Sequence, residues 1–157
     1  MVRTIFTAAL LAGFATSAFA DGIMVMEPYA RTSRPNAPNG AAFMQIMNHT
    51  DRDVQLIAVE QAISNKAELH THEMNVETGV VKMFEVEDGF SIPAGETLTL
   101  ERGGNHIMIL GLNEPLIQDS EFALKLIFEN ADPIDVNVIV DNERVADDTM
   151  EIDHSGH

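Results

Sequence analysis

The sequence predicts an all-β protein, a sandwich or barrel built from a single domain. Short runs of β-branched and aliphatic residues recur along the chain, and clusters of Gly, Pro, Asn or Asp separate them. Many short strands at regular spacing are typical of sandwiches and barrels. No segment shows a convincing amphipathic helical period, and no internal repeat or second domain is visible.

Residues 1–20 have the pattern of a secretory signal peptide. Arg3 precedes a mostly apolar run over residues 5–14, and the segment ends in Ala-Phe-Ala, a small-x-small cleavage pattern. The apolar run is too short to span a bilayer stably, although an uncleaved N-terminal membrane anchor is a competing interpretation. No later run is long and apolar enough for a transmembrane helix. We expect cleavage near Ala20 and an exported protein without stable membrane insertion.

The composition excludes several classes of function. The chain holds 25 Asp and Glu against 9 Lys and Arg, a formal net charge of −16 at pH 7. Nucleic acids and anionic membranes favour basic surfaces, so neither is an expected partner. The chain has no cysteine, which excludes disulfides, thiolate metal sites, a cysteine nucleophile and a blue-copper centre.

The first three predicted strands are bounded by turn residues. Pro28 within the first strand indicates an edge or a bulge. Residues 31–40 are rich in Ser, Pro, Asn and Gly and are predicted as a loop, and residues 48–53 form a polar turn. The strands cover residues 23–30, 41–47 and 54–60.

The remaining strands follow the same alternation. Residues 75–79 interrupt two strands that we expect to form a hairpin, and residues 92–95, Ile-Pro-Ala-Gly, are predicted as a turn. These strands cover residues 68–74, 80–86, 97–100, 122–128 and 134–140, with one more inside residues 103–112. The folded domain is therefore expected over residues 21–141. Residues 142–157 are acidic, lack an apolar period and are predicted as a flexible tail.

The stretch of residues 103–112 contains a candidate pair of metal ligands. Side chains alternate across a strand, so His106 and Met108 emerge on one face and Ile107 and Ile109 on the other. An imidazole beside a thioether is a soft ligand pair that suits Cu(I) better than Mg, Ca or Mn. Alone, this pair is more typical of a half-buried histidine beside a methionine that fills a gap in the core.

The predicted hairpin supplies further soft ligands. His70 and His72 share one face of their strand. A turn around residues 77–78 places Met83 opposite His72, close enough for both to share one metal. Whether the strand of His106 lies beside this hairpin is left open by the sequence.

Four sequence blocks, in this order, resemble the PCu(A)C family of periplasmic copper chaperones. The blocks are ELHTHEM (residues 68–74), GVVKMFEV (79–86), IPAG (92–95) and GGNHIMILGL (103–112). Further matches at residues 41–44 and 124–128 extend the resemblance over nearly all of the chain beyond the signal peptide. The order of the blocks is far more specific than a lone His-x-Met.

The resemblance implies a cupredoxin-like Greek-key β-sandwich in the periplasm that binds Cu(I) through two histidines and two methionines. Met83 matches the family's first methionine, and His106 and Met108 match its His-x-Met. The first histidine is ambiguous: alignment of the blocks favours His70, whereas the ten-residue gap to Met83 favours His72. The chain departs from the family at Val81, often a methionine there, and in its longer hairpin.

Three classes of function follow. The resemblance implies a metallochaperone that delivers copper to the copper centre of cytochrome c oxidase, in subunit II, or to another periplasmic copper protein. A periplasmic buffering or resistance protein without a dedicated acceptor would use the same ligands. An enzyme is not expected, because the chain shows no Ser-His-Asp arrangement, no three-histidine zinc pattern and no paired catalytic carboxylates.

The C-terminus contains a second candidate site. Asp153, His154 and His157 offer nitrogen and oxygen donors, which suit Cu(II) better than Cu(I). We therefore regard His154 and His157 as a candidate auxiliary Cu(II) site, and a solvated tail as the alternative.

Overall fold

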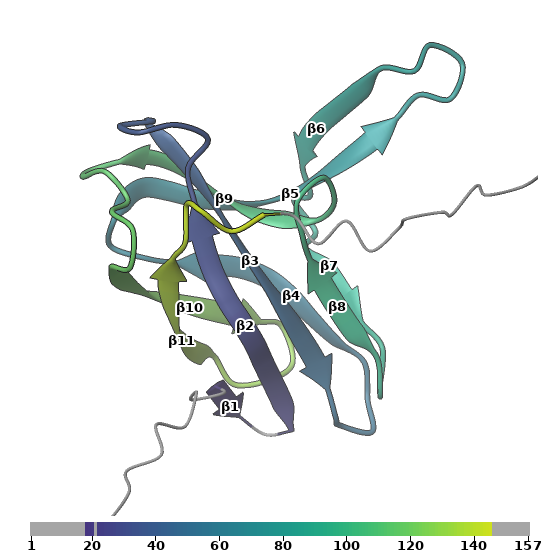
Figure 1. The fold of residues 1–157 in the computed structure, drawn as a ribbon. Coiled ribbons are helices and arrows are strands. Elements are labelled where there is room, and N and C mark those ends of the chain that lie inside the picture. Colours follow the sequence, from purple (N-terminus) through teal and green to yellow (C-terminus); the bar gives the residue numbers. More distant parts are fainter. Residues whose placement is uncertain (1–17, 21, 146–157) are drawn as a thin grey trace, which may run out of the picture.

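The computed structural model describes residues 18–20 and 22–145. The regular secondary structure of these residues consists of β-strands alone. The all-β prediction is confirmed. The strands are β1 (Ala18–Ala20), β2 (Ile23–Arg31), β3 (Asn39–Asn48), β4 (Val54–Glu60), β5 (Ser64–Met74), β6 (Val81–Glu85), β7 (Phe90–Ile92), β8 (Thr97–Leu100), β9 (His106–Leu112), β10 (Glu121–Phe128) and β11 (Ile134–Val140) (Figure 1).

The strands form one hydrogen-bonded network that folds over on itself. Its order is β6-β5-β9-β3-β2-β11-β10-β4-β7, with β1 paired to β2 and β8 paired to β3. The network divides at β3, because residues 39–42 pair with β9 and residues 44–47 pair with β8. All pairs are antiparallel except that of β2 with β11. Strands far apart in sequence, such as β3 and β9 or β2 and β11, thereby become neighbours.

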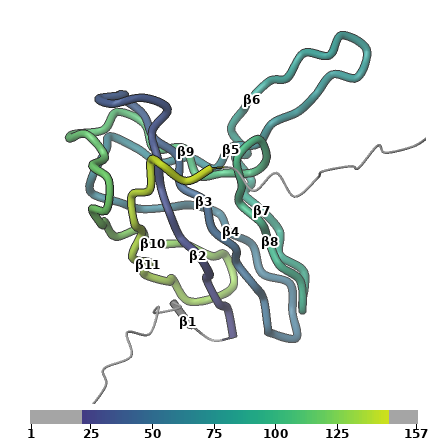
Figure 2. The backbone as a smooth tube through the Cα atoms, in the orientation of Figure 1, coloured from purple at the N-terminus to yellow at the C-terminus, as the bar shows by residue number. Residues whose placement is uncertain are grey.

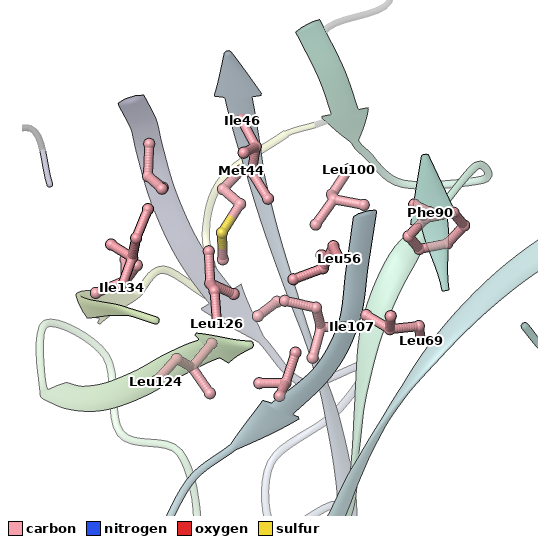
Figure 3. Close-up of a cluster of buried hydrophobic side chains, with 14 of the residues drawn as sticks. Met44, Ile46, Leu56, Leu69, Phe90, Leu100, Ile107, Leu124, Leu126 and Ile134 are labelled. Atoms are coloured by element: carbon pink, nitrogen blue, oxygen red, sulfur yellow. The ribbon is translucent and has the colours of Figure 1, made fainter. Parts of the chain in front are cut away.

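A single hydrophobic core fills the space between the strands. Strand β11 illustrates how the sequence favours strands. Its side chains alternate strictly between buried and exposed positions, so an extended backbone places most of its apolar residues on the core side. Figure 3 shows core side chains from several strands packed together, among them Leu56, Ile107 and Leu126. Each fully buried aliphatic side chain contributes roughly 1.5–3 kcal/mol. The core therefore supplies the stability that disulfides give to many exported proteins.

The hairpin of β5 and β6 projects beyond this body (Figure 2). Its turn is closed by Asn75, whose side-chain oxygen accepts hydrogen bonds from the amides of Glu77 (2.9 Å) and Thr78 (3.1 Å). Every residue of β6 is exposed. The predicted hairpin and turn are confirmed, and only the inner part of β5 is held against the core.

The structure differs from the sequence prediction at several places. Strand β7 was not predicted, because its three residues are too few to show alternation. Strand β5 begins at Ser64 rather than residue 68, since pairing with β9 imposes strand structure on a polar segment. Asn142, predicted as tail, is docked: its side chain accepts from the Thr32 amide (2.9 Å) and donates to the Leu116 carbonyl (3.1 Å).

The ends of the chain bear on two further predictions. Strand β1 pairs with β2 although it falls inside the predicted signal peptide, so this pairing belongs to the uncleaved chain. Residues 1–17 lie outside the described residues, and cleavage near Ala20 stays a prediction. Within residues 18–20 and 22–145, no helix has the length and apolar character needed to cross a membrane.

Candidate metal centre

Strand pairing brings the two groups of candidate ligands to one place. Strand β5 lies between β6 and β9, with His72 opposite Met83 on one side and His70 opposite His106 on the other. Directly paired residues of antiparallel strands share a face of the sheet. The predicted pairing of His72 with Met83 is confirmed, and the position of the His106 strand, open in the sequence, is beside β5.

Four of the five candidate ligands line one open pocket of about 580 Å³. These are His72, Met83, His106 and Met108. The pocket lies between the hairpin, the start of β9 and the loop that joins β2 to β3. His70 does not line it. His106 is 4% exposed and Met83 46% exposed, so the pocket combines a buried imidazole with an accessible thioether.

One backbone carbonyl orients both histidines of the pocket. The oxygen of Gly104 lies 2.9 Å from Nδ1 of His106 and 3.2 Å from Nδ1 of His72. A carbonyl can only accept, so each Nδ1 carries the hydrogen and each Nε2 keeps its lone pair. The ring centroids are 5.2 Å apart. Holding a ligand histidine through its other nitrogen is a common device of metal sites, and it fixes the tautomer that binds metal.

The loop that carries this carbonyl is itself held in place. Gly103 has a φ of +81°, which favours glycine because a side chain would be strained there. The amide of Glu101 donates to the Asn105 carbonyl (2.8 Å), and the Thr71 hydroxyl on β5 donates to the side-chain oxygen of Asn105 (2.7 Å). The loop between β8 and β9 is thus tied to the hairpin that supplies His72.

His70 has different partners. Its Nε2 donates to a carboxylate oxygen of Glu68 at 2.8 Å, and the same carboxylate pairs with Lys66. Lys66 and then His70 lower the pKa of the Glu68 carboxyl below its ordinary value. Nδ1 of His70 is buried and has no hydrogen-bond partner among the described residues. Nδ1 of His70 is therefore unpartnered within the described part of the chain, but the residue does not line the pocket.

Burial lowers the pKa of His106 below its ordinary value of 6.5. The carbonyl of Gly104 acts in the opposite direction, while the nearby His72 and His70 lower the pKa further. Loss of water around the charged ring explains the main effect. His106 is therefore neutral, the form that binds metal, at pH 7 and somewhat below it.

The lowered pKa predicts a pH-dependent stability. On acidification through 6.5, the unfolded chain protonates His106 before the folded protein does, so the free energy of unfolding should fall between pH 6.5 and the lower folded pKa. His106→Gln should remove this contribution. Urea unfolding of metal-free protein between pH 7.5 and 5.5 measures it, with the exposed His49→Gln as the control. A wild-type protein that gained stability relative to His106→Gln on acidification would contradict the prediction.

Sequence reasoning missed several residues around the pocket. Arg31, Arg34, Arg102 and Phe43 line it, although residues 31–40 were predicted only as a loop. Phe43 packs near His106, with ring centroids 6.3 Å apart. The Gly104 carbonyl left no side-chain signal. For Arg31 and Arg34 a signal was available: two of the nine Lys and Arg residues of the chain lie within four positions of each other.

The donor set depends on thioethers. Among the described residues, no three His, Cys, Asp or Glu side chains come close enough together to hold a metal ion. A metal in this pocket would thus need Met83 and Met108 in addition to the imidazoles, and that combination fits Cu(I). His154 and His157 lie outside the described residues.

Comparison with known proteins shows which family this chain belongs to. The model of the LpqE-like lipoprotein family matches residues 23–140. A relative named as a lipoprotein, Lxx21020 of Leifsonia xyli subsp. xyli, is 33% identical over 121 residues, which cover 77% of this chain and 70% of the relative.

Solved structures of PCuAC domains share the fold. The copper-bound PCuAC domain of PmoF2 superposes with a TM-score of 0.66 at 18% identity, covering 81% of this chain and 98% of that domain. Apo-DR1885 from Deinococcus radiodurans gives 0.59 at 23% identity, covering 90% and 95%. Its Cu(I) form gives 0.59 at 26% identity, covering 78% and 80%. The fold is therefore the cupredoxin-like β-sandwich that the resemblance implied.

Proposed function

We propose, for a chain that belongs to the LpqE-like family and has the PCuAC fold, that it is a periplasmic metallochaperone which binds one Cu(I) and passes it on. The observation that carries the proposal is the pocket in which two imidazoles and two thioethers meet. The similarity to a protein whose structure was solved with Cu(I) supports the same metal.

The proposed ligands are His72, Met83, His106 and Met108. Each has an uncharged donor: the Nε2 atoms are left free by the Gly104 carbonyl, and the thioether sulfurs need no deprotonation. Soft neutral donors favour Cu(I) over Cu(II) and over hard cations. We prefer His72 to His70 because His72 lines the pocket, whereas Nε2 of His70 is bound to Glu68.

The pocket is suited to releasing copper as well as holding it. Met83 lies on β6, where every residue is exposed, so an acceptor's ligands can reach the metal from that side. Ligand exchange between soft donors then moves Cu(I) without changing its charge. We propose that the acceptor is the copper centre of cytochrome c oxidase subunit II or another periplasmic copper protein, and that the chain catalyses no reaction.

A competition titration tests copper binding. Wild-type protein should take up about one Cu(I) against a chromogenic chelator, and His106→Ala should lose most of this binding because it removes a donor from the pocket. Transfer of the bound Cu(I) to the apo copper domain of oxidase subunit II then tests the chaperone role. Tight binding without transfer would favour the buffering function. Wild-type affinity in His106→Ala would exclude this pocket.

Removing residues 149–157 should leave the Cu(I) affinity nearly unchanged, because the proposed thioether ligands lie in the described domain. If His154 and His157 bind Cu(II), the truncation should lower the Cu(II) stoichiometry. Acidification below about pH 6 should have the same effect, since free histidines protonate near pH 6.5. Competition titrations of both oxidation states on full-length and truncated protein measure this. Unchanged Cu(II) stoichiometry after truncation would contradict the tail site.

A further inference from the structure

The copper pocket is basic in a strongly acidic protein. Its lining includes Arg31, Arg34 and Arg102 and contains no Asp or Glu. The whole chain has 25 Asp and Glu but only 9 Lys and Arg. Three of the nine basic residues of the chain therefore line this one pocket, whereas none of the acidic residues in the described part of the chain does. We call these three residues the arginine rim.

Two members of the arginine rim, Arg31 and Arg102, contact a backbone carbonyl rather than a carboxylate. None of the three arginines forms an ion pair within residues 18–20 and 22–145. Nη1 of Arg31 lies 3.3 Å and Nη1 of Arg102 lies 3.5 Å from the same backbone carbonyl, that of Arg144. Two like charges are thus held near one another by a shared dipole alone. An anion between them would relieve this repulsion.

The side-chain type favours an oxyanion such as a carboxylate. Guanidinium groups bind carboxylates through two parallel hydrogen bonds, which a point charge such as lysine cannot do. Arg34 and Arg102 are exposed, so they can reach a ligand outside the pocket. The same rim repels bare cations, including the copper ion that the pocket is proposed to bind. Copper would therefore approach more readily within a complex that carries negative charge.

We propose that the arginine rim is a carboxylate-binding site for the molecule that exchanges copper with the pocket. This inference rests on the proposed Cu(I) site. The carboxylates bind Arg31, Arg34 and Arg102 while the metal moves between the carrier's donors and the His and Met donors of the pocket. Copper stays Cu(I) throughout, and a carrier that donates copper leaves as the metal-free anion, more negative by the one positive charge it gave up. The carboxylates can belong to a small chelator or to the acidic face of a protein.

Stopped-flow transfer of Cu(I) tests the site with full-length protein. The donors are the bicinchoninate complex, which is anionic through its carboxylates, and the cationic acetonitrile complex. Arg34→Gln combined with Arg102→Gln should slow transfer from bicinchoninate about tenfold at low salt, because a field of one sign in a cleft raises on-rates by at least that factor. Transfer from acetonitrile should not slow.

A matched control removes two other positive charges. Arg52→Gln combined with Lys125→Gln changes the net charge equally, at residues that do not line the pocket. This variant should transfer copper from bicinchoninate at close to the wild-type rate. Equal slowing in the two double variants, or equal slowing with both copper donors, would overturn the carboxylate site.

A second pair of probes identifies the source of the carboxylates. Two Cu(I)-loaded peptides share a Met-x-x-Met motif, one flanked by glutamates and the other by lysines. Faster transfer from the glutamate peptide, lost in the rim variant, assigns the site to an acidic protein face. An effect with bicinchoninate alone assigns it to a small carrier, and an effect with neither overturns the proposal. Equilibrium Cu(I) affinity separates this failure from failure of the copper site, because the rim variant keeps all four proposed ligands and should bind Cu(I) at least as tightly as the wild type.

Discussion

Met83→Leu should weaken Cu(I) binding by more than about 100-fold, because it removes a proposed ligand, and loss of an outer-shell partner alone typically costs 10- to 100-fold. Leucine keeps the volume and the apolar character of the side chain. Met83 is 46% exposed, so the substitution should cost well under about 1.5 kcal/mol of stability. Competition with a Cu(I) chelator measures the affinity, and thermal unfolding of the metal-free protein measures the stability.

Met74→Leu is the matched control for this experiment. Met74 lies on the same hairpin and is 62% exposed, but it does not line the pocket. The Met74→Leu variant should bind Cu(I) with wild-type affinity. If Met83→Leu retained wild-type affinity, the sulfur of Met83 would not be a ligand. An equal loss in both variants would indicate that the hairpin, rather than one thioether, determines binding.

His72→Asn should lower Cu(I) affinity by more than about 100-fold, while His70→Asn should stay close to wild type. The two residues are two positions apart on one face of β5, but only His72 lines the pocket with Met83 and His106. Asparagine cannot supply the imidazole nitrogen. The Cu(I) X-ray absorption signature should change for His72→Asn and not for His70→Asn.

The order is reversed for stability: His70→Asn should lower the free energy of unfolding more than His72→Asn does. His70 is 9% exposed and hydrogen-bonded to Glu68, so His70→Asn should cost about 1–3 kcal/mol. His72→Asn should cost less, since His72 is more exposed and its hydrogen bond to Gly104 is longer. The Cu(I) affinities are therefore compared at a temperature at which both variants are still fully folded. Loss of Cu(I) binding in His70→Asn alone would transfer the ligand role from His72 to His70.

Local features were predictable from the sequence. Alternation of apolar and polar residues identified the strands because one face of each strand must enter the core, as in β11. The pairing of His72 with Met83 was predictable as well, since a short turn fixes the register of the two strands it joins. The types of metal donor could be predicted without any structure, because the thioether of methionine and the imidazole of histidine are properties of the residues themselves.

Features that depend on distant strands were not predictable. Whether β9 lies beside β5, and hence whether His106 meets His72, depends on pairing between strands more than thirty residues apart. No local pattern specifies such a partner. The preference for His72 over His70 has the same origin, because alternation puts both on one face and only the surrounding elements decide which of them lines a pocket.

The Gly104 carbonyl and the arginine rim also emerged only in the folded protein. A backbone oxygen has no sequence signature, so its contact with two imidazoles exists only once the loop and the hairpin are side by side. Arg31 and Arg102 line the same pocket because the end of β2 and the turn before β9 are brought together by the pairing of β3 with both β2 and β9. Sequence alone determined which chemical groups the chain carries and which of them share a strand face. Their convergence on one pocket was decided by long-range strand pairing, because the burial of a common core, rather than any local preference, selects which strands become neighbours.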